Sequence, residues 1–249
     1  MKKVLITGMS GLIGGLLRRR LESVGGYELS ALNRSLVEGV ECHQADIADL
    51  EAIQPAFVGK DVVVHLAAYL EDDWEGNLPA NIIGTYNVYE AARLAGVKRV
   101  IFASSGYVIR GYASVPPYDA IAAGQYDKVP ENWPKITHEM LWPIEIYGAA
   151  KVWGEALGRH YSDAYGISIL CVRIGMVWPD DRPHDIHDHS IYLSHRDIAQ
   201  ILQKCIEAPE DLKYDIFMAT SNNRWTYRDL EHPRKVLGWV PQDSADDFS

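Results

Sequence analysis

Short apolar runs alternate with longer segments of helical periodicity through the first two-thirds of the chain. The runs at 62–66 and 167–174 are almost continuously apolar, which is typical of parallel strands covered on both faces. The pattern predicts strands at 3–7, 27–32, 40–43, 62–66, 97–103 and 167–174, and helices at 12–24, 50–57, 82–94, 147–165 and 196–207. Strands and helices that alternate at this spacing predict an α/β fold with a doubly wound parallel sheet.

Two stretches depart from this alternation. Residues 112–143 are rich in proline and aromatic side chains, which favours an ordered functional loop such as a lid or binding loop. Beyond Ile174 the alternation fades, so we expect residues 175–249 to form a small substrate-binding cap. This cap is expected to belong to the same globule and to lie against the carboxyl ends of the strands.

Composition narrows the classes of function. The 249 residues carry a formal net charge of −10, so nucleic-acid binding is not expected as the main role. The three cysteines are far apart and fit no disulfide framework or metal-ligand spacing, which favours a reducing compartment. The N-terminus shows no signal-peptide pattern, and no apolar run approaches the roughly 18 residues that span a bilayer. We expect a soluble cytoplasmic protein that binds no membrane.

A glycine-rich turn follows the first predicted strand. Gly8, Gly11 and Gly14 stand between a strand and a helix, the context of a dinucleotide-binding turn. The first glycine permits the tight bend, the second lets the backbone approach a pyrophosphate, and the third lets the helix pack on the strand. The helix N-terminus then faces the phosphates. We therefore predict a Rossmann-type dinucleotide-binding domain over 1–174, with cofactor contacts from Gly8, Ser10, Gly11, Leu12, Ile13 and Gly14.

The end of the second predicted strand bears on the choice of cofactor. Dinucleotide folds place an acidic residue there to hold the ribose 2′-hydroxyl of NAD, whereas a nearby Arg accommodates the 2′-phosphate of NADP. This chain has Asn33 followed by Arg34, which favours NADP and leaves NAD possible. Asp46 and Ile47, after the third strand, are expected to reach the adenine ring.

Three side chains are candidate catalytic groups. Tyr147 and Lys151 lie four residues apart on the longest predicted helix and therefore project from one face. A free tyrosine titrates near pH ~10, and a nearby ammonium together with an oxidised nicotinamide would lower the pKa of the phenol. Ser105 ends an apolar run and could hydrogen-bond a substrate oxygen while charge develops on it. With the glycine turn, this combination predicts hydride transfer with proton exchange.

A histidine-rich stretch invites a metal hypothesis. His184, His187 and His189 alternate with two aspartates, but this spacing matches no standard metal site. We therefore predict no metal, and read the stretch as a solvated or substrate-lining loop.

One helix also bears on assembly. Trp153, Leu157 and Tyr161 form an apolar stripe on the helix predicted at 147–165. Such a stripe suits either a helix–helix contact in a homodimer or burial against the chain's own sheet, and the sequence leaves both readings open.

The chain resembles an extended short-chain dehydrogenase/reductase, a member of the NAD-dependent epimerase/dehydratase family, over nearly its whole length. The likeness lies in Thr7–Gly14, Asp46-Ile47, His65–Ala68, Asn81–Thr85, Phe102–Ser105, Tyr147–Lys151, His195–Ala199 and Leu237–Pro241. The resemblance implies further cofactor contacts from Leu66, Ala67 and Ala68, ribose binding by Lys151, and support of the catalytic centre by Asn81.

Within this family the pattern is most similar to the uronate dehydrogenases, which oxidise a free sugar acid at C1 to a lactone using NAD. The chain departs from them at three places. Gly106 and Tyr107 replace an Asn-His pair after the catalytic serine, His187 takes the place of a carboxylate-binding Arg, and Asn33 replaces an Asp. The resemblance therefore implies Ser105, Tyr107 and His187 as substrate contacts without implying uronate itself.

Three functions compete. The leading hypothesis is an NAD(P)-dependent dehydrogenase or reductase that acts on a small hydroxyl or carbonyl compound such as a sugar or sugar acid. The second is a sugar or nucleotide-sugar epimerase that retains its cofactor through the reaction. The third is a non-enzymatic NAD(P)-sensing regulator, and the Tyr147/Lys151 pair weighs against it.

Overall fold

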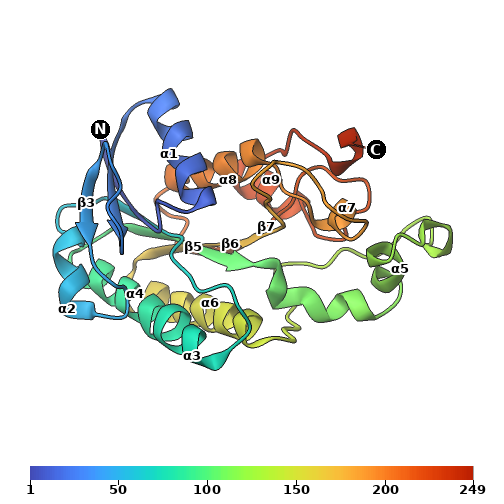
Figure 1. The fold of residues 1–249 in the computed structure, drawn as a ribbon, viewed down its shortest axis with the longest axis horizontal. Coiled ribbons are helices and arrows are strands. Elements are labelled where there is room, and N and C mark those ends of the chain that lie inside the picture. Colours follow the sequence, from blue (N-terminus) through green and yellow to red (C-terminus); the bar gives the residue numbers. More distant parts are fainter. Residues whose placement is uncertain (249) are drawn as a thin grey trace.

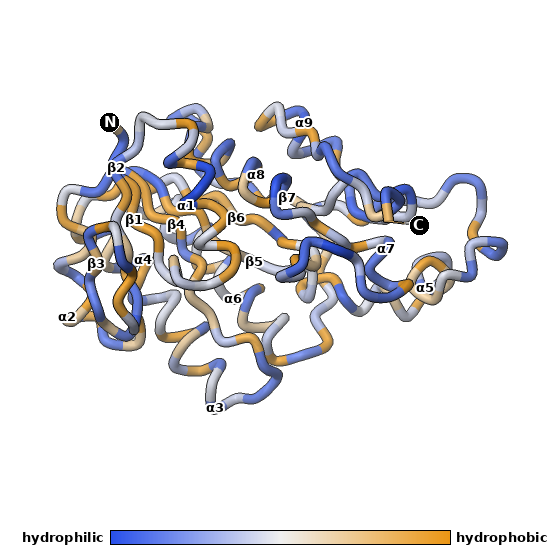
Figure 2. Tube along the Cα trace, turned by 45° about the horizontal axis from the view of Figure 1, so that its top comes forward, coloured by the Kyte–Doolittle hydropathy of each residue, from blue (hydrophilic) through white to orange (hydrophobic). Residues whose placement is uncertain are grey.

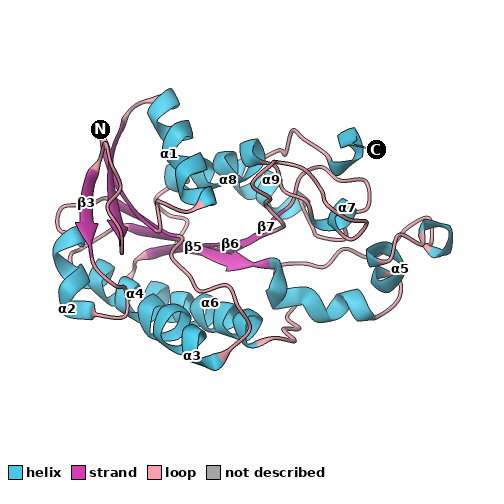
Figure 3. Ribbon diagram, viewed as in Figure 1, coloured by secondary structure: helices cyan, strands magenta, loops and turns pink. Residues whose placement is uncertain are grey.

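A parallel sheet organises the computed structural model, which describes residues 1–248 (Figures 1 and 3). Its 7 strands follow the order β3-β2-β1-β4-β5-β6-β7, and every neighbouring pair is parallel. The strands are β1 (Lys2–Thr7), β2 (Tyr27–Asn33), β3 (Glu41–Gln44), β4 (Val62–His65), β5 (Arg99–Ser105), β6 (Ser168–Ile174) and β7 (Tyr214–Ala219). This arrangement confirms the predicted Rossmann-type, doubly wound α/β sheet.

Helices cover both faces of the sheet. On one face, uppermost in Figure 1, α1 (Leu12–Val24) and α8 (His195–Glu207) pack side by side. The other face carries α2 (Leu50–Ile53), α4 (Gly84–Leu94) and α6 (Ile146–Tyr165). Each face has its own apolar core, and the strands between them are the hydrophobic centre of the chain in Figure 2.

Most predicted elements form within a few residues of their predicted bounds, and prolines explain two of the differences. The helix predicted at 50–57 stops being α-helical after Ile53 and continues as a 3₁₀ turn, Gln54–Phe57, because Pro55 lacks an N–H and its ring clashes with the preceding turn. The helix predicted at 82–94 begins at Gly84, after the π-helical segment Leu78–Ile83, which contains Pro79.

The expectation that the alternation fades beyond Ile174 is wrong for part of that region. Helix α8 leads into β7, which extends the parallel sheet beside β6. The sequence of β7, with Tyr214 and Asp215 at its start, hides the strand because this half is not apolar. Shorter elements complete the described chain: α3 (Trp74–Asn77), α5 (Tyr118–Ala122), α7 (Asp188–Ile191) and α9 (Glu231–Leu237), with 3₁₀ turns at Gly106–Ser114, Tyr126–Lys128 and Ala245–Phe248.

The stretch 112–143 is ordered, as its aromatic content predicts. It extends beyond the sheet from the end of β5 (Figure 1) and packs into a third apolar cluster with residues near the C-terminus. Ile121 and Ile136 from the stretch meet Tyr227 in this cluster. Ile136 also forms a parallel β-bridge with Arg228. The stretch and the segment around 225–230 therefore form one wall at the carboxyl ends of the strands.

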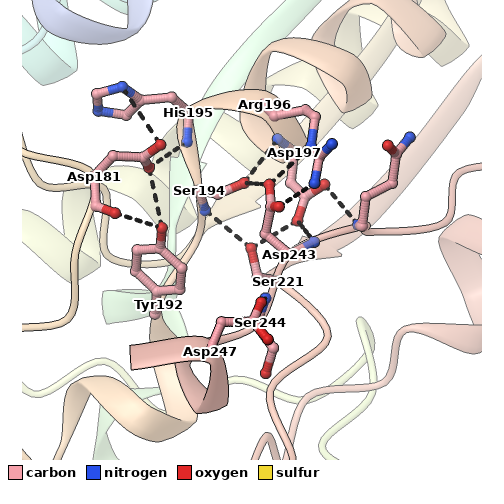
Figure 4. A network of polar contacts seen from close by, with 11 residues as sticks. Asp181, Tyr192, Ser194, His195, Arg196, Asp197, Ser221, Asp243, Ser244 and Asp247 are labelled. Carbon is pink, nitrogen blue, oxygen red and sulfur yellow. Dashed lines mark hydrogen bonds and ion pairs between the residues drawn. The ribbon is translucent and has the colours of Figure 1, made fainter. Parts of the chain in front are cut away.

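A polar network ties the C-terminal segments to α8 (Figure 4). The carboxylate of Asp197 accepts hydrogen bonds from the hydroxyl of Ser221 (2.7 Å) and from the backbone N–H groups of Gln242 (2.8 Å) and Asp243 (3.2 Å). Ser194 caps α8 and donates to Asp243 (2.6 Å). The segment His195–Ala199 is thus joined directly to the chain that follows Leu237–Pro241. Within residues 1–248 no helix has the combination of length and apolarity that a membrane span requires.

Candidate active site

A cavity of about 740 Å³ opens at the carboxyl ends of the first strands, where open α/β sheets bind their ligands. All the positions predicted from the glycine turn and the strand ends line it: Gly8, Ser10, Gly11, Leu12, Ile13, Gly14, Asn33, Arg34, Asp46, Ile47, Leu66, Ala67 and Ala68. These predicted cofactor contacts therefore come together in one place, whereas Tyr147 and Lys151, also predicted to contact the cofactor, are not among the residues that line the cavity.

The glycines of the turn leave room that side chains would fill. A Cβ on Gly8 would lie 2.8 Å from the backbone nitrogen of Ala67, and Gly8 has a φ of +72°. A Cβ on Gly14 would lie 2.6 Å from the carbonyl oxygen of Gly8. Helix α1 begins directly after Gly11 and has no side-chain cap, so its first N–H groups are free for a phosphate. This cradle fits a dinucleotide pyrophosphate.

At the end of β2, the residue that lines the cavity is the uncharged Asn33. Asn33 donates to the hydroxyl of Ser10 (2.7 Å), and its carbonyl oxygen accepts from the Ser10 backbone N–H (3.4 Å). Asn33 therefore holds the turn rather than presenting a negative charge. Arg34 is exposed at the rim of the cavity, where a phosphate on the ribose could reach its guanidinium.

A threonine fixes the strand end that borders the nicotinamide side of the cavity. The hydroxyl of Thr7 accepts from the backbone N–H groups of Leu66 (3.2 Å) and Ala67 (3.1 Å), and lies 2.8 Å from Nδ1 of His65. Burial lowers the pKa of His65 to about 3, so its ring is neutral at ordinary pH and can accept the hydroxyl proton. Sequence reasoning missed this role of Thr7.

Tyr147 stands in the first turn of α6, close to Ser105 at the end of β5. Burial raises the pKa of Tyr147 to about 12, while a hydrogen bond with Ser105 lowers it in part. The predicted lowering of the phenol's pKa depends on the Lys151 ammonium together with an oxidised nicotinamide, and it stays a prediction.

Lys151 lies one helical turn further along and is 3% exposed. Its Nζ lies 5.5 Å from the ring centroid of Tyr147 and 5.0 Å from that of Phe102. Burial lowers the pKa of Lys151 to about 8, partly offset by the charge of Glu155. The ammonium thus lies beside the phenol in surroundings that disfavour its charge.

A close helix approach positions the tyrosine. A Cβ on Gly148 would lie 2.7 Å from the carbonyl oxygen of Tyr107, so only glycine lets α6 pack this closely on the segment after Ser105. The Ser105 hydroxyl accepts from the backbone N–H of Tyr107 (3.2 Å), and the Tyr107 ring meets that of Tyr147 edge-on at 5.4 Å. Ser105, Tyr107 and Tyr147 form one contiguous group.

Asn81 supports the site from behind. It accepts from the backbone N–H of Tyr69 (3.0 Å) and donates to the carbonyl of the same residue (2.7 Å) and to the side chain of Asn77 (2.6 Å). It therefore clamps the loop that follows Ala67 and Ala68. These contacts make Asn81 a positioning residue.

The histidine stretch forms a hydrogen-bonded loop. Asp188 is buried and accepts from the indole of Trp178 (2.7 Å) and the backbone of His184 (2.8 Å). Among residues 1–248, the His/Asp group close enough to share an ion lies elsewhere, at His138, Asp215 and His232.

That group does not have the arrangement of a metal site. The rings of His138 and His232 are stacked at 4.0 Å with an interplanar angle of 18°, so no point lies in the plane of both rings at bonding distance. Nε2 of His232 instead meets Asp215 at 2.7 Å.

The three side chains of the apolar stripe on α6 differ in their surroundings, which bears on whether the stripe packs on the chain's own sheet or on a second copy. Tyr161 is buried and Leu157 packs against the core of the same chain. Trp153 is 40% exposed. Burial against the chain's own sheet therefore accounts for two of the three side chains.

A second cavity of about 710 Å³ lies at the opposite ends of the strands and includes Lys2, Lys98 and Arg99. It contains none of the candidate residues. Ligands of open parallel sheets bind at the carboxyl ends, so we place the active site at the first cavity.

Comparison with known proteins identifies the family. Residues 4–204 match the NAD dependent epimerase/dehydratase family. The chain belongs to this family. It is 33% identical to the uronate dehydrogenase of Agrobacterium fabrum, over 100% of this chain and 87% of that protein. It is 31% identical to the NAD-dependent glucose-6-phosphate dehydrogenase of Haloferax volcanii, over 99% of this chain and 95% of that one.

The fold agrees with this assignment. The crystal structure of uronate dehydrogenase from Agrobacterium tumefaciens superimposes with a TM-score of 0.82 at 31% identity, covering 100% of this chain and 87% of that structure. Membership in the epimerase/dehydratase family and the likeness to the uronate dehydrogenases are thus confirmed.

Proposed function

We propose that the protein is an NAD(P)-dependent dehydrogenase that transfers a hydride between the nicotinamide and a hydroxyl or carbonyl carbon of a small sugar or sugar acid. The observation that carries this proposal is the group of buried Ser105, half-buried Tyr147 and buried Lys151, which follows Ala103 of the cavity lining along β5 and across to α6. The names of the relatives, which act on a uronate and on glucose 6-phosphate, support this substrate class.

Each residue has a defined task. The bound cofactor accepts or supplies the hydride. Tyr147 exchanges the proton with the substrate oxygen, Ser105 hydrogen-bonds that oxygen, and Lys151 binds the ribose and stabilises the phenolate once it forms. Burial raises the pKa of Tyr147 to about 12, and the positive charge of a bound, oxidised nicotinamide would favour the phenolate and so help the phenol to act as a base.

Arg34 and Asn33 support NADP as the preferred cofactor. Asn33 offers no carboxylate to the ribose hydroxyls, and Arg34 is free to approach a 2′-phosphate at the cavity rim. NAD is a possible cofactor of the same site, since the relative from Haloferax volcanii is named as NAD-dependent.

The partner and compartment follow from weaker features. The free cysteines Cys42, Cys171 and Cys205 support a reducing cytoplasm. The exposed apolar side chains on α4 and α6 support a homodimer.

Replacement of the catalytic phenol tests the proposal. Tyr147→Phe should lower kcat by about 10² to 10⁴-fold, because general acid–base catalysis contributes a factor of this size. Binding of NADPH, followed by fluorescence, should stay within a few-fold of wild type. A Tyr147→Phe variant that oxidises or reduces its sugar as fast as wild type would overturn the assignment.

The epimerase alternative makes a different prediction about the cofactor. An epimerase returns the hydride to its own substrate, so it works with cofactor that stays bound and needs none added. We expect the purified protein to need added NAD(P) for every turnover and to change absorbance at 340 nm. Conversion of one sugar epimer into another, without net reduction of added cofactor, would favour the epimerase.

A further inference from the structure

Arg228 is a buried cation that has no carboxylate partner among residues 1–248, although it lies over the ring of Tyr227 (5.5 Å). The residue is 5% exposed, and its Nε and Nη1 atoms are buried and make no hydrogen bond within residues 1–248. No carboxylate of these residues forms an ion pair with it, whereas the other deeply buried guanidinium near the site, Arg173, is held by Glu155 at 2.8 Å. Burial lowers the pKa of Arg228, and the neighbouring Tyr227 is the group that opposes this shift.

A buried charge without a counter-charge costs free energy and is uncommon unless something outside the fold offsets it. The backbone, in contrast, is firmly held. Ile136 donates to the carbonyl of Tyr227 (2.7 Å) and accepts from the N–H of Asp229 (3.0 Å), so the insertion pins the chain on both sides of Arg228. The fold therefore keeps an unsatisfied guanidinium in a fixed place.

That place adjoins the segment that follows Ser105. A Cβ on Gly106 would overlap with Nη2 of Arg228, so the guanidinium lies on the backbone of the residue that follows Ser105. The missing side chain at Gly106 is what leaves room for it. Ile174, which is paired with Ser105 across β5 and β6, presents its carbonyl at the same point.

Two cations act on His187, which is the loop residue predicted to contact substrate. Burial lowers the pKa of His187, the charges of Arg228 and Arg110 lower it further, and those of Asp185 and Asp188 oppose the shift. Arg110 already has partners, since it lies over the ring of Tyr107 (4.4 Å) and 3.5 Å from Glu145. Arg228 lies over the ring of Tyr227 (5.5 Å) but, within residues 1–248, has no carboxylate partner.

We propose that Arg228 is the residue that recognises an anionic group, a carboxylate or a phosphate, on the sugar substrate. A guanidinium offers two parallel donors to either group, which fixes the orientation of the sugar as well as its charge. The sugar carbon to be oxidised would then lie toward Ser105 and Tyr147. This inference rests on the proposed dehydrogenase function, and the substrate class it names is an acidic sugar.

The first test compares matched substrates. Wild type, Arg228→Met and Arg228→Lys are assayed with glucuronate, galacturonate and glucose 6-phosphate, and with neutral glucose and galactose. Arg228→Met should lower kcat/KM for the charged sugars by about 10- to 100-fold, because hydrogen bonds to a charged group contribute that much. The neutral sugars should change by less than about threefold, so the ratio of charged to neutral falls. Arg228→Lys should keep part of the preference for charged sugars. Comparing the losses for glucuronate and galacturonate with the loss for glucose 6-phosphate decides whether the arginine binds a carboxylate or a phosphate.

The matched control is Arg224→Met, on the same segment but exposed and lying over Trp225. It should leave the ratio of charged to neutral sugars unchanged. Equal losses for charged and neutral sugars in Arg228→Met, or no loss for either, would overturn the inference.

The second test does not depend on turnover. NADPH-saturated protein is heated with increasing glucuronate or inorganic phosphate, and the unfolding midpoint is recorded. Wild type should rise with at least one of these anions and Arg228→Met should not. Without any anion, Arg228→Met should be at least as stable as wild type, because it removes an uncompensated buried charge.

The two tests separate the failure of each idea. If wild type oxidises no sugar but its midpoint rises with anion only when Arg228 is present, the dehydrogenase assignment fails and the anion site stands. If wild type oxidises sugars while its unfolding midpoint does not change with either anion, the proposed anion site is wrong. A variant that unfolds several degrees below wild type would show that Arg228 is structural, and would also overturn the inference.

Discussion

Asn33 and Arg34 are two neighbouring residues on which the choice of cofactor rests. Arg34→Ala should lower kcat/KM for NADP⁺ by about 10- to 100-fold, since it removes charged hydrogen bonds to the 2′-phosphate. The value for NAD⁺ should stay within about threefold. The exposed Arg19 on the first helix supplies a control, Arg19→Ala, which should change neither value. Steady-state kinetics with both cofactors decide the matter, and a wild type that prefers NAD⁺ would show the preference for NADP to be wrong.

His65 links this strand end to the stability of the fold. Its pKa in the folded protein is about 3, far below the value near 6.5 of an unfolded histidine. As the pH falls below about 6.5, His65 takes up a proton in the unfolded chain but stays neutral in the folded protein. The free energy of unfolding therefore decreases by up to about 1.4 kcal/mol per pH unit. Above that pH the effect disappears.

A neutral replacement isolates this contribution. His65→Asn can still accept the hydroxyl of Thr7 but cannot titrate. Urea unfolding at pH 7 and pH 5 should show that wild type loses about 2 kcal/mol more than the variant over this interval. Parallel losses in the two proteins would mean that His65 is protonated in the folded state.

Among single residues, the sequence identifies those that belong to a local spacing. The glycine turn and the Tyr147/Lys151 pair are such cases, and the structure brings the turn together with its strand ends in one cavity. The contact of Thr7 with His65 and the place of Arg228 carry no local signal. Their roles depend on residues 58 or more positions away in the chain, so only the tertiary structure reveals them.

The elements around the site are joined by a buried ion pair. Arg173 of β6 meets Glu155 of α6 through two 2.8 Å contacts, and the hydroxyl of Ser104 on β5 donates to the same carboxylate (2.6 Å). Glu155→Gln removes the counter-charge of a fully buried guanidinium. We expect it to destabilise the fold by about 3 to 5 kcal/mol, measured by denaturant unfolding.

The double variant Glu155→Leu with Arg173→Met separates the effect of the unpaired charge on stability from the effect of packing. It removes both charges at similar volume, so its stability should recover much of the loss seen in Glu155→Gln. A double variant as unstable as the single one would show that packing, and not the unpaired charge, dominates.

At the level of elements, long periodic segments were predictable and short or mixed ones were not. The helix at 12–24 has its predicted bounds, and the helix at 147–165 starts one residue early at Ile146. Strand β7 was missed because Asp215 interrupts the apolar pattern in its half-buried first half. The alternation of the last third was therefore visible in α8 but hidden in the strand that follows it.

For the molecule as a whole, the sequence predicts the parallel sheet and the position of the cofactor cavity. It does not predict that residues 112–143 and 225–230 form one wall, because no local pattern relates them. That wall fixes Arg228, on which the proposed substrate class depends. The cofactor cavity was thus readable from sequence, whereas the proposed substrate contact needed the folded chain.

Assembly is the remaining property at this scale. Helices α4 and α6 pack beside each other, and their outer surface exposes Ile83, Tyr86 and Trp153, each about two-fifths exposed. Apolar side chains gathered on one face favour association, and a two-fold axis would bring the same face of a second copy against it. We therefore expect a dimer at micromolar concentration.

Trp153→Glu would place a charge in that contact and should shift the mass measured by light scattering toward the monomer, while its unfolding midpoint stays close to that of wild type. Leu36→Glu, at an exposed position after β2, is the matched control and should leave the dimer intact. A wild type that remains monomeric would rule out the proposed dimer, and a Trp153→Glu dimer would place the contact on another face.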